Sequence, residues 1–245
     1  MAYHIQRGNT FLTNLTGETN IETASSLEEI FIAAKAKYKI GFRDEWVCFS
    51  PETFVQIEGR RIRSFPMKGT IDASLPDAEK LLMNDPKEIA EHYTIVDLIR
   101  NDLSKVATNV EVKRFRYIDR IITSGKTLLQ VSSQIEGQLP ENFRDQLGVI
   151  LFSLLPAGSI SGAPKKKTLE IIQEAEQYQR GFYTGVAFYF DGRDVDSCVL
   201  IRFIEKKQTS NGDRLVYKSG GGITFHSEAE KEFQELNDKI YVPCV

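Results

Sequence analysis

Hydrophobic and polar residues follow two different periods along this chain. Short segments rich in β-branched and aromatic residues, a pattern typical of strands, lie at 45–49, 53–57 and 60–64. Because Ser50-Pro51 and Glu58-Gly59 interrupt them, the spacing predicts one strand followed by a hairpin in an antiparallel sheet. Further strands are predicted at 110–115, 128–135, 183–190, 197–205 and 214–218.

Other segments carry apolar residues at helical spacing, which predicts helices over residues 77–83 and 87–103. The apolar stripe of the second helix consists of Ile89, Ile95, Leu98 and Ile99. Three more helices are predicted at 143–155, 166–177 and 228–241. Strands and helices come in runs and do not alternate strictly, so the pattern favours an α+β fold with large antiparallel sheets flanked by helices. Without an internal repeat or a long linker, residues 1–245 are expected to form one domain.

The composition excludes several classes of protein. The chain has 31 Lys and Arg against 34 Asp and Glu, a net charge of −3, so no broad basic surface for nucleic acid is expected. No apolar segment approaches the ~20 residues that span a bilayer, and the polar first residues are unlike a signal peptide. The unpaired set Cys48, Cys198 and Cys244 forms no CxxC motif, which argues against disulfides and a zinc site. A cytoplasmic protein is therefore expected.

Three consecutive glycines, Gly220, Gly221 and Gly222, follow a predicted strand and precede a predicted helix. Glycines allow a close approach of the backbone to a ligand, and their N–H groups can bind an anion. A flexible hairpin loop explains the same pattern, so the glycines alone leave both interpretations open.

Two carboxylates and a lysine follow on the last predicted helix. Glu232, Glu235 and Lys239 are spaced at i, i+3 and i+7, so they share one helical face. A solvated row of ion pairs is one interpretation. A Mg²⁺ site is the other, and it would need a further oxygen ligand. Glu91 is the candidate, because it lies on the same face as Ile95 in a mostly apolar helix, where a carboxylate requires a partner.

Two further segments could contribute chemistry. Lys68 lies between a predicted strand and a glycine turn, where burial could make its amine nucleophilic, although most lysines are simply solvated. Residues 156–165 are expected to be a loop that leads into a helix, with Ser161 as its cap and Pro164 in its first turn. The N–H groups there could bind an anion, or the segment could be a plain capped helix with residues 165–167 in solvent.

Together these segments resemble the chorismate-utilising enzymes, a family that includes anthranilate synthase component I, aminodeoxychorismate synthase component I, and the isochorismate and salicylate synthases. The resemblance extends from about Ile5 to Lys239. The motifs that carry it are 50–52 (SPE), 66–70 (PMKGT), 90–103 (AEHYTIVDLIRNDL), 156–165 (PAGSISGAPK), 183–185 (YTG), 201–202 (IR), and 220–222 (GGG) with Glu232, Glu235 and Lys239.

The resemblance implies a chorismate site with Mg²⁺ bridging a substrate carboxylate to Glu91 and Glu235, and with Glu232 as a nearby metal or outer carboxylate. It also implies a second, anionic part of the site. There Arg202 and Tyr183 would hold the enolpyruvyl carboxylate, assisted by Lys239 and the backbone of residues 220–222. The ring pocket would be lined by Gly69 and Thr70.

The residue before Gly-Thr separates the reactions within the family, and Lys68 at this place resembles the aminodeoxychorismate synthases. This implies two displacements, in which the amine of Lys68 adds to chorismate first and ammonia replaces it, with Glu52 as proton donor. Leu12 stands where isochorismate and salicylate synthases have a water-activating lysine. Leu129 stands where many relatives have a histidine, which tells against an anthranilate-type elimination.

The expected function is therefore aminodeoxychorismate synthase component I, acting in the route to 4-aminobenzoate and folate, with ammonia supplied freely or by a glutamine amidotransferase subunit. Anthranilate synthase component I is the nearer alternative. The more distant one is a chain that binds a ligand or partner without turnover. Typical members have a longer region before Gly8-Asn9, so either a compact form or pairing with another chain, such as a homodimer, is expected.

Overall fold

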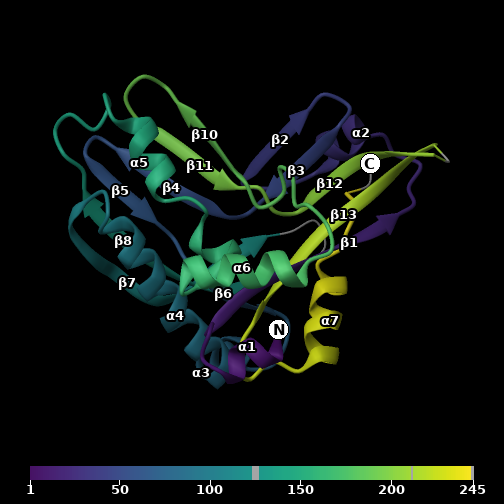
Figure 1. Cartoon of the computed structure of the whole chain (residues 1–245), viewed down its shortest axis with the longest axis horizontal. Helices are drawn as coiled ribbons and strands as arrows, with labels where there is room; N and C mark the ends of the chain where they lie inside the picture. The colour runs from purple at the N-terminus through teal and green to yellow at the C-terminus, as the bar shows by residue number, and fades with distance from the viewer. Residues whose placement is uncertain (123–126, 211, 244–245) are drawn as a thin grey trace.

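The computed structural model describes residues 1–122, 127–210 and 212–243, and Figure 1 shows the chain as two sheets with helices around them. In the first sheet the strand order is β2 (Tyr38–Phe42), β3 (Trp46–Ser50), β12 (Phe203–Thr209), β13 (Gly212–Ile223), β1 (Leu12–Ile21) and β9 (Gly162–Ala163). In the second it is β10 (Val186–Phe190), β11 (Val195–Val199), β4 (Thr53–Glu58), β5 (Arg61–Ser64), β8 (Thr127–Gln138) and β6 (Met67–Asp72), with β7 (Thr108–Ile122) also paired to β8.

Helices cover both sheets. They are α1 (Ala2–Gln6), α2 (Leu27–Ala33), α3 (Ala78–Asn84), α4 (Pro86–Leu103), α5 (Leu147–Ser153), α6 (Lys165–Ala175), α7 (Ala229–Asp238) and the 3₁₀ turn η1 (Gly158–Ile160). Helix α4 packs on β6, β7 and β8, whereas α6 contacts β1 and α7 contacts β13 (Figure 1). Every strand pair in the described residues is antiparallel, so the α+β prediction is confirmed.

Apolar side chains join the two sheets. Trp46 and Phe203 of the first sheet stack with ring centroids 4.9 Å apart. They share a buried cluster with Cys198 and Leu200, which come from the second sheet and the segment that leaves it. Cys48 and Cys198 are free and buried, as the lack of a pairing pattern predicts; Cys244 lies outside the described residues. This shared core packs the two sheets against each other.

Several predicted elements are confirmed with small shifts in their ends. The hairpin forms between β4 and β5, with Ile57 opposite Ile62. Helix α4 begins as its sequence suggests, because the Asp85 side chain accepts a hydrogen bond from the Glu88 N–H, and Pro86 occupies the first turn. The helices predicted at 143–155, 166–177 and 228–241 appear as α5, α6 and α7.

The strand predicted at 197–205 is wrong as a single element. The chain leaves the second sheet after β11 and enters the first with β12, and Arg202, with φ of 56°, lies at the turn between them. Both pieces are apolar and β-prone, so the hydrophobic pattern continues through the change of sheet. The strand predicted at 183–190 begins only at Val186, because Thr184 turns the chain at a φ of 63°.

The first 44 residues were assigned no element, yet they form α1, β1, α2 and β2. Strand β1 is rich in Thr and Asn and shows no alternation of buried and exposed residues; it pairs with β13 along most of its length and with β9 at Leu12 and Thr13. Helix α2 did carry a readable signal. Ser26 and Glu29 form a reciprocal capping box at its start.

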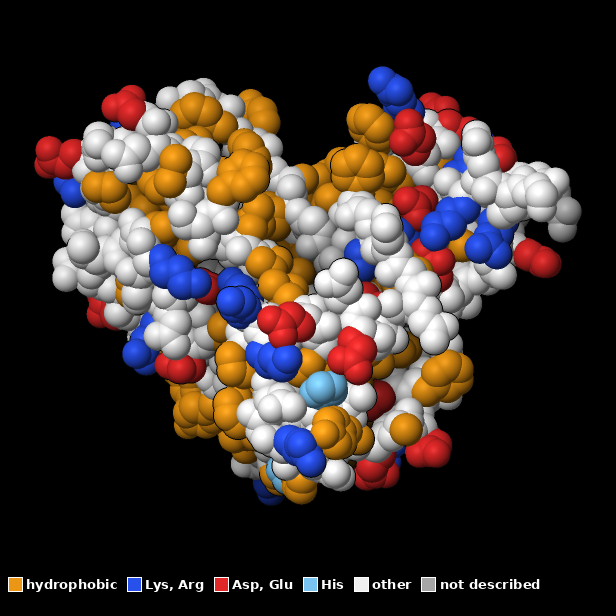
Figure 2. All heavy atoms as spheres, in the orientation of Figure 1, with side chains coloured by type: hydrophobic (Ala, Val, Ile, Leu, Met, Phe, Trp, Pro, Cys, Tyr) orange, Lys and Arg blue, Asp and Glu red, His pale blue; other side chains and the backbone are white. Residues whose placement is uncertain are grey.

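The two sheets end at exposed aromatic strands. Strand β10 closes one end of the second sheet and β2 one end of the first. Phe188 and Tyr189 on β10, and Phe42 on β2, are exposed. In Figure 2 a hollow with hydrophobic side chains on both walls lies at the top of the molecule, where Figure 1 places β10 and β2. No helix of the described residues is long and apolar enough to cross a membrane.

Candidate active site

The predicted site residues meet where β6 of the second sheet faces β13 of the first. Lys68 on β6 lies 3.3 Å, from Nζ to Oε2, from Glu91 on α4. Gly222 on β13 lies directly against this pair, since a Cβ atom added there would be 2.8 Å from Lys68 Nζ and 3.2 Å from Glu91 Oε2. A side chain at this position would displace the Lys68 ammonium, so three residues predicted from separate motifs share one place.

The strand predicted at 214–218 continues through residues 220–222, so the interpretation of these glycines as a flexible hairpin loop does not hold. They belong to β13, where Gly220, Gly221 and Gly222 lie opposite Thr16, Leu15 and Asn14 of β1. A Cβ atom at Gly220 would be 2.8 Å from Thr16 Cγ2 and 3.2 Å from the Tyr183 hydroxyl. Because these residues are glycines, this part of β13 carries no side chains where it passes the site.

The last helix presents its charges on one face, as the spacing predicts. Lys239, just past the end of α7, pairs with Glu235 at 2.6 Å and donates a hydrogen bond to the Gly220 carbonyl at 2.8 Å. Burial raises the pKa of Glu235, but the charge and hydrogen bond of Lys239 together with the charges of Lys87 and Lys68 outweigh it and leave this pKa below the usual range. Burial also lowers the pKa of Lys239.

Arg202 and Tyr183 lie next to these residues. The Arg202 guanidinium donates a hydrogen bond to the Lys239 carbonyl at 3.1 Å. Tyr183 is only 3% exposed, and burial raises the pKa of its hydroxyl, so the phenol stays neutral. A cation, a neutral hydroxyl and the Lys239 ammonium form a set that can bind a carboxylate.

Glu52 lies between β3 and β4, where the chain passes from one sheet to the other. Burial raises the pKa of its carboxyl, and this effect outweighs the hydrogen bond from the Ser159 hydroxyl and the charges of Lys68, Arg202 and Lys239. A carboxyl with a raised pKa stays protonated to higher pH, which suits a proton donor.

Gly69 and Thr70 differ in their surroundings. Gly69 has a φ of 76°, and a Cβ atom there would lie 2.9 Å from Leu82 Cδ1 and 3.0 Å from Glu88 Oε2. Glycine is therefore needed for both backbone and space. Thr70 is exposed, and its hydroxyl accepts a hydrogen bond from Gln130 on β8. Lys68 itself belongs to β6, at a register shift against β8, and not to a turn after a strand.

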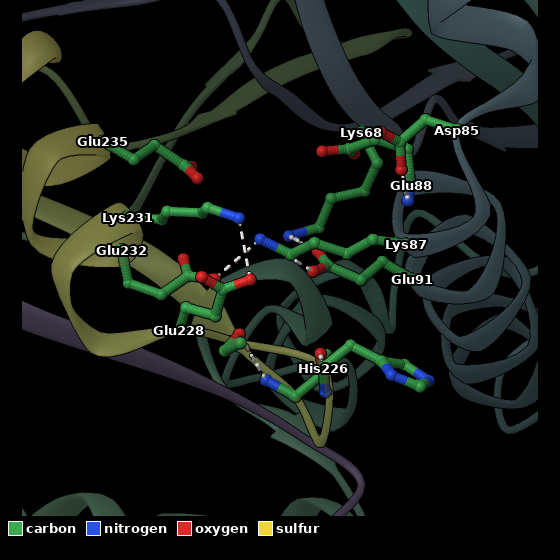
Figure 3. Close-up of polar contacts among 12 residues, drawn as sticks. Lys68, Asp85, Lys87, Glu88, Glu91, His226, Glu228, Lys231, Glu232 and Glu235 are labelled. Atoms are coloured by element: carbon green, nitrogen blue, oxygen red, sulfur yellow. Dashed lines mark hydrogen bonds and ion pairs between the residues drawn. The ribbon is translucent and has the colours of Figure 1, made fainter.

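Lys87 was not predicted as a site residue. Its ammonium lies 2.6 Å from Glu232 Oε1 and 3.9 Å from Glu91 Oε1, and Figure 3 shows it pointing from α4 toward the carboxylates. Glu91 and Glu232 are each 5% exposed, and Glu91 Oε1 and Glu232 Oε2 have no hydrogen-bond partner among the described residues. The spacing of Lys87 four residues before Glu91 is the signal that could have indicated it.

Glu88 and Ser159 were also missed as individual site residues. Burial, and after it the charge of Glu91, raises the pKa of Glu88, while Lys68 and Lys87 oppose this. Both residues could have been inferred, because Glu88 precedes Glu91 by nearly one helical turn and Ser159 lies within a matching motif.

The segment at 156–165 contributes in a way different from the one predicted. Ser161 does not cap α6, whose N-cap is Pro164; its hydroxyl donates to the Ala157 carbonyl instead. Lys165 is not in solvent, because it pairs with the buried Asp102 at 2.6 Å, and burial lowers its pKa.

The two unpartnered carboxylate oxygens provide a test of the predicted metal. Within residues 1–122, 127–210 and 212–243, no three His, Cys, Asp or Glu side chains come close enough together to hold an ion. Glu91 and Glu232 nevertheless present buried hard oxygens without partners, and Glu235 extends from the same face of α7 (Figure 3). Oxygen donors of this kind fit Mg²⁺.

Comparison with known proteins decides the family. Residues 1–244 match the model of the chorismate binding enzymes. This chain belongs to that family. It is 55% identical over 239 residues to an uncharacterised PabA-like protein of Pasteurella multocida, covering 98% of this chain and 72% of the relative.

Relatives named for a function are also similar to this chain. It is 37% identical over 201 residues to anthranilate synthase component 1 of Spirochaeta aurantia, covering 78% of this chain and 39% of the relative. The solved anthranilate synthase component I of Streptococcus pneumoniae has the same fold, with a TM-score of 0.79 at 26% identity over 97% of this chain. The chain spans 54% of the length of that structure.

Proposed function

We propose that this protein is component I of an aminodeoxychorismate synthase, which aminates chorismate at C4 to give 4-amino-4-deoxychorismate. The observation that carries the proposal is the place of Lys68. Its amine lies against Gly222 and 3.3 Å from Glu91, with the side chain only 18% exposed. A lysine held in such a place can reach a bound substrate as a nucleophile.

The reaction balances with two displacements. The Lys68 nitrogen bonds to C2 of chorismate, the ring double bond shifts, and the C4 hydroxyl leaves as water with the proton that Glu52 donates. Ammonia then bonds to C4, the double bond returns, and the bond from C2 to Lys68 breaks. The net change is chorismate plus ammonia to aminodeoxychorismate plus water. The raised pKa of Glu52 supports its role as the donor.

Binding of the substrate uses the rest of the cluster. Arg202, Tyr183 and Lys239 would hold the enolpyruvyl carboxylate. Glu91, Glu232 and Glu235 would hold Mg²⁺, which, when bound, neutralises the other substrate carboxylate. In this proposal, ammonia comes from free ammonium or from a glutamine amidotransferase subunit. The protein acts in the cytoplasm, and a homodimer is one form in which it assembles.

Anthranilate synthase component I is the second candidate, favoured by the Spirochaeta aurantia relative. Two apolar residues support amination over the other reactions. Leu129, at the place of the family histidine, is buried beside Leu82 and Val131 and supplies no acid or base. The Cδ1 atom of Leu12 lies 3.3 Å from the Cβ position of Gly222, beside the Lys68 amine, and cannot activate water there.

The test incubates the protein with chorismate, Mg²⁺ and ammonium and identifies the products by mass. We expect aminodeoxychorismate, and a loss of at least about a thousandfold in its rate with Lys68→Ala, because the nucleophile is removed. Lys231→Ala, which changes an exposed lysine on α7, is the control and should keep the wild-type rate. Anthranilate or isochorismate as the product would contradict the proposal, and so would chorismate binding without any product.

A further inference from the structure

Lys87 occupies the space between two carboxylates that the fold brings together from distant parts of the chain. Glu91 lies on α4 and Glu232 on α7, and Lys87 Nζ is 3.9 Å and 2.6 Å from them. Each carboxylate side chain is 6% exposed, whereas that of Lys87 is 30% exposed. Two buried like charges so close together require a counter-ion.

Lys87 meets this need only in part. It is within hydrogen-bond distance of one oxygen, Glu232 Oε1, while Glu91 Oε1 and Glu232 Oε2 have no hydrogen-bond partner among the described residues. Buried polar atoms are normally hydrogen-bonded, so two such oxygens facing one ammonium are unusual. A divalent ion carries twice the charge of an ammonium and binds several oxygens at once.

The ammonium can also leave this place. Lys87 belongs to the first turn of α4, directly after Pro86, and Figure 3 shows its side chain extending from that end of the helix. With almost a third of its surface exposed, the flexible side chain can rotate into solvent without moving the backbone. Glu91 and Glu232 are buried and remain where the helices hold them.

We propose that Lys87 is a resident counter-ion, which holds Glu91 and Glu232 together in the absence of metal and is displaced when Mg²⁺ binds them. This inference rests on the Mg²⁺ site of the proposed function. Lys87 is a positioning residue here, because it keeps the two carboxylates aligned and needs no contact with substrate. Its ammonium and Mg²⁺ compete for the same oxygens.

The first experiment measures Mg²⁺ binding by calorimetry, with Mg²⁺ alone as the probe. Lys87→Met removes the competing charge and keeps the length of the side chain, so it should bind Mg²⁺ at least about tenfold more tightly than the wild type. Lys87→Arg retains a cation and should bind no more tightly than the wild type.

Lys231→Met is the matched control. It removes the same charge from an exposed lysine of α7, whose partner at 2.7 Å is the exposed Glu228 and not Glu91 or Glu232. It should change the affinity by less than about threefold. Weaker or equal Mg²⁺ binding by Lys87→Met would overturn the proposal. So would an absence of Mg²⁺ binding in both the wild type and Lys87→Met.

Thermal unfolding gives a second readout. Without Mg²⁺, Lys87→Met should melt below the wild type, because Glu232 then loses its paired ammonium and Lys68, 3.3 Å from Glu91 Oε2, compensates the repulsion only in part. Saturating Mg²⁺ should raise the melting temperature of Lys87→Met by more than that of the wild type. An equal increase in both proteins would contradict displacement.

A third measurement uses only the wild type and so remains decisive if Lys87→Met does not fold. Lysines are modified with an amine-reactive reagent, and peptide masses give the rate at each site. Mg²⁺ should speed labelling of Lys87 at least about threefold, because the displaced amine enters solvent, and should leave Lys231 unchanged. Unchanged or slower labelling of Lys87 would overturn the proposal. A product other than aminodeoxychorismate would refute the proposed function alone.

Discussion

Glu176 and Glu232 both have a buried side chain that pairs with a cation, but the two carboxylates are satisfied to very different degrees. Glu176 accepts hydrogen bonds from the Thr16 N–H and hydroxyl at 2.8 Å each, and from two Arg180 nitrogens at 2.7 and 2.8 Å. Glu232 accepts one, from Lys87, and its second oxygen has no partner among the described residues. The first carboxylate is saturated by the protein, whereas the second retains capacity for a ligand.

The saturated group, here called the anchor cluster, consists of Thr16, Glu176 and Arg180. Its guanidinium also donates to the carbonyls of Asn14 and Ile160, each at 2.8 Å. The Arg180 side chain thereby connects β1 and the 156–165 segment to the turn that leads to Tyr183. The group formed by Lys87, Glu91 and Glu232, the site cluster, connects α4 and α7, and Glu91 also pairs with Lys68 on β6. The difference predicts that the anchor cluster contributes more to stability than the site cluster, to which the proposed function assigns metal binding.

The largest effect is expected from neutralising the anchor cluster. Glu176→Gln should lower the free energy of unfolding by about 2–4 kcal/mol, because it leaves the Arg180 charge buried and removes charge-assisted hydrogen bonds. Denaturant unfolding measures this. Glu170→Gln, on the exposed side of α6, is the control and should cost less than about 0.5 kcal/mol. If Glu176→Gln lowers the free energy of unfolding by less than about 1 kcal/mol, the anchor cluster is no more important for stability than the site cluster.

An intermediate effect is expected on β13, which passes between the two clusters. Gly220→Ala should cost about 1–3 kcal/mol, because its methyl group would lie 2.8 Å from Thr16 Cγ2 and close to the Tyr183 hydroxyl. Gly17→Ala, on the paired strand β1, has open space and should change stability by less than about 0.5 kcal/mol. Equal effects of both substitutions in denaturant unfolding would show that Gly220 is not tightly packed.

The smallest effect on stability is expected from the substitution Glu232→Gln. It is the same chemical change as Glu176→Gln at nearly the same burial, with side-chain exposures of 6% and 3%. Without metal it should cost less than about 1 kcal/mol, because only one hydrogen bond is involved and repulsion with Glu91 is relieved. Mg²⁺ affinity should fall at least about tenfold in calorimetry. A stability loss equal to that of Glu176→Gln would show that Glu232 is structural.

Local signals in the sequence predicted much of the fold around the site. The helix predicted at 87–103, the β4–β5 hairpin and the shared face of Glu232, Glu235 and Lys239 depend on residues close together in the chain. The motifs also contain Lys68, Glu91 and Gly222, which lie in contact in the structure. Such features follow from capping, turn chemistry and helical period, which need no tertiary partner.

Other predictions failed because the deciding partner lies far away in the chain. Residues 220–222 form a strand because β1 pairs with them, although three glycines favour a loop. The chain changes sheets between β11 and β12 without any change in its hydrophobic pattern. The strand β1 has a polar sequence and owes its conformation to neighbours on both sides.

The sequence by itself determined which side chains are available for chemistry and which of them share a helix or strand, because those relations depend on local geometry. The tertiary structure alone decided that Lys87 lies between Glu91 and Glu232, whose helices are separated by more than a hundred residues. It also decided which carboxylates are saturated. That distinction depends on how α4, α7 and β13 pack, and packing sums contacts from the whole chain.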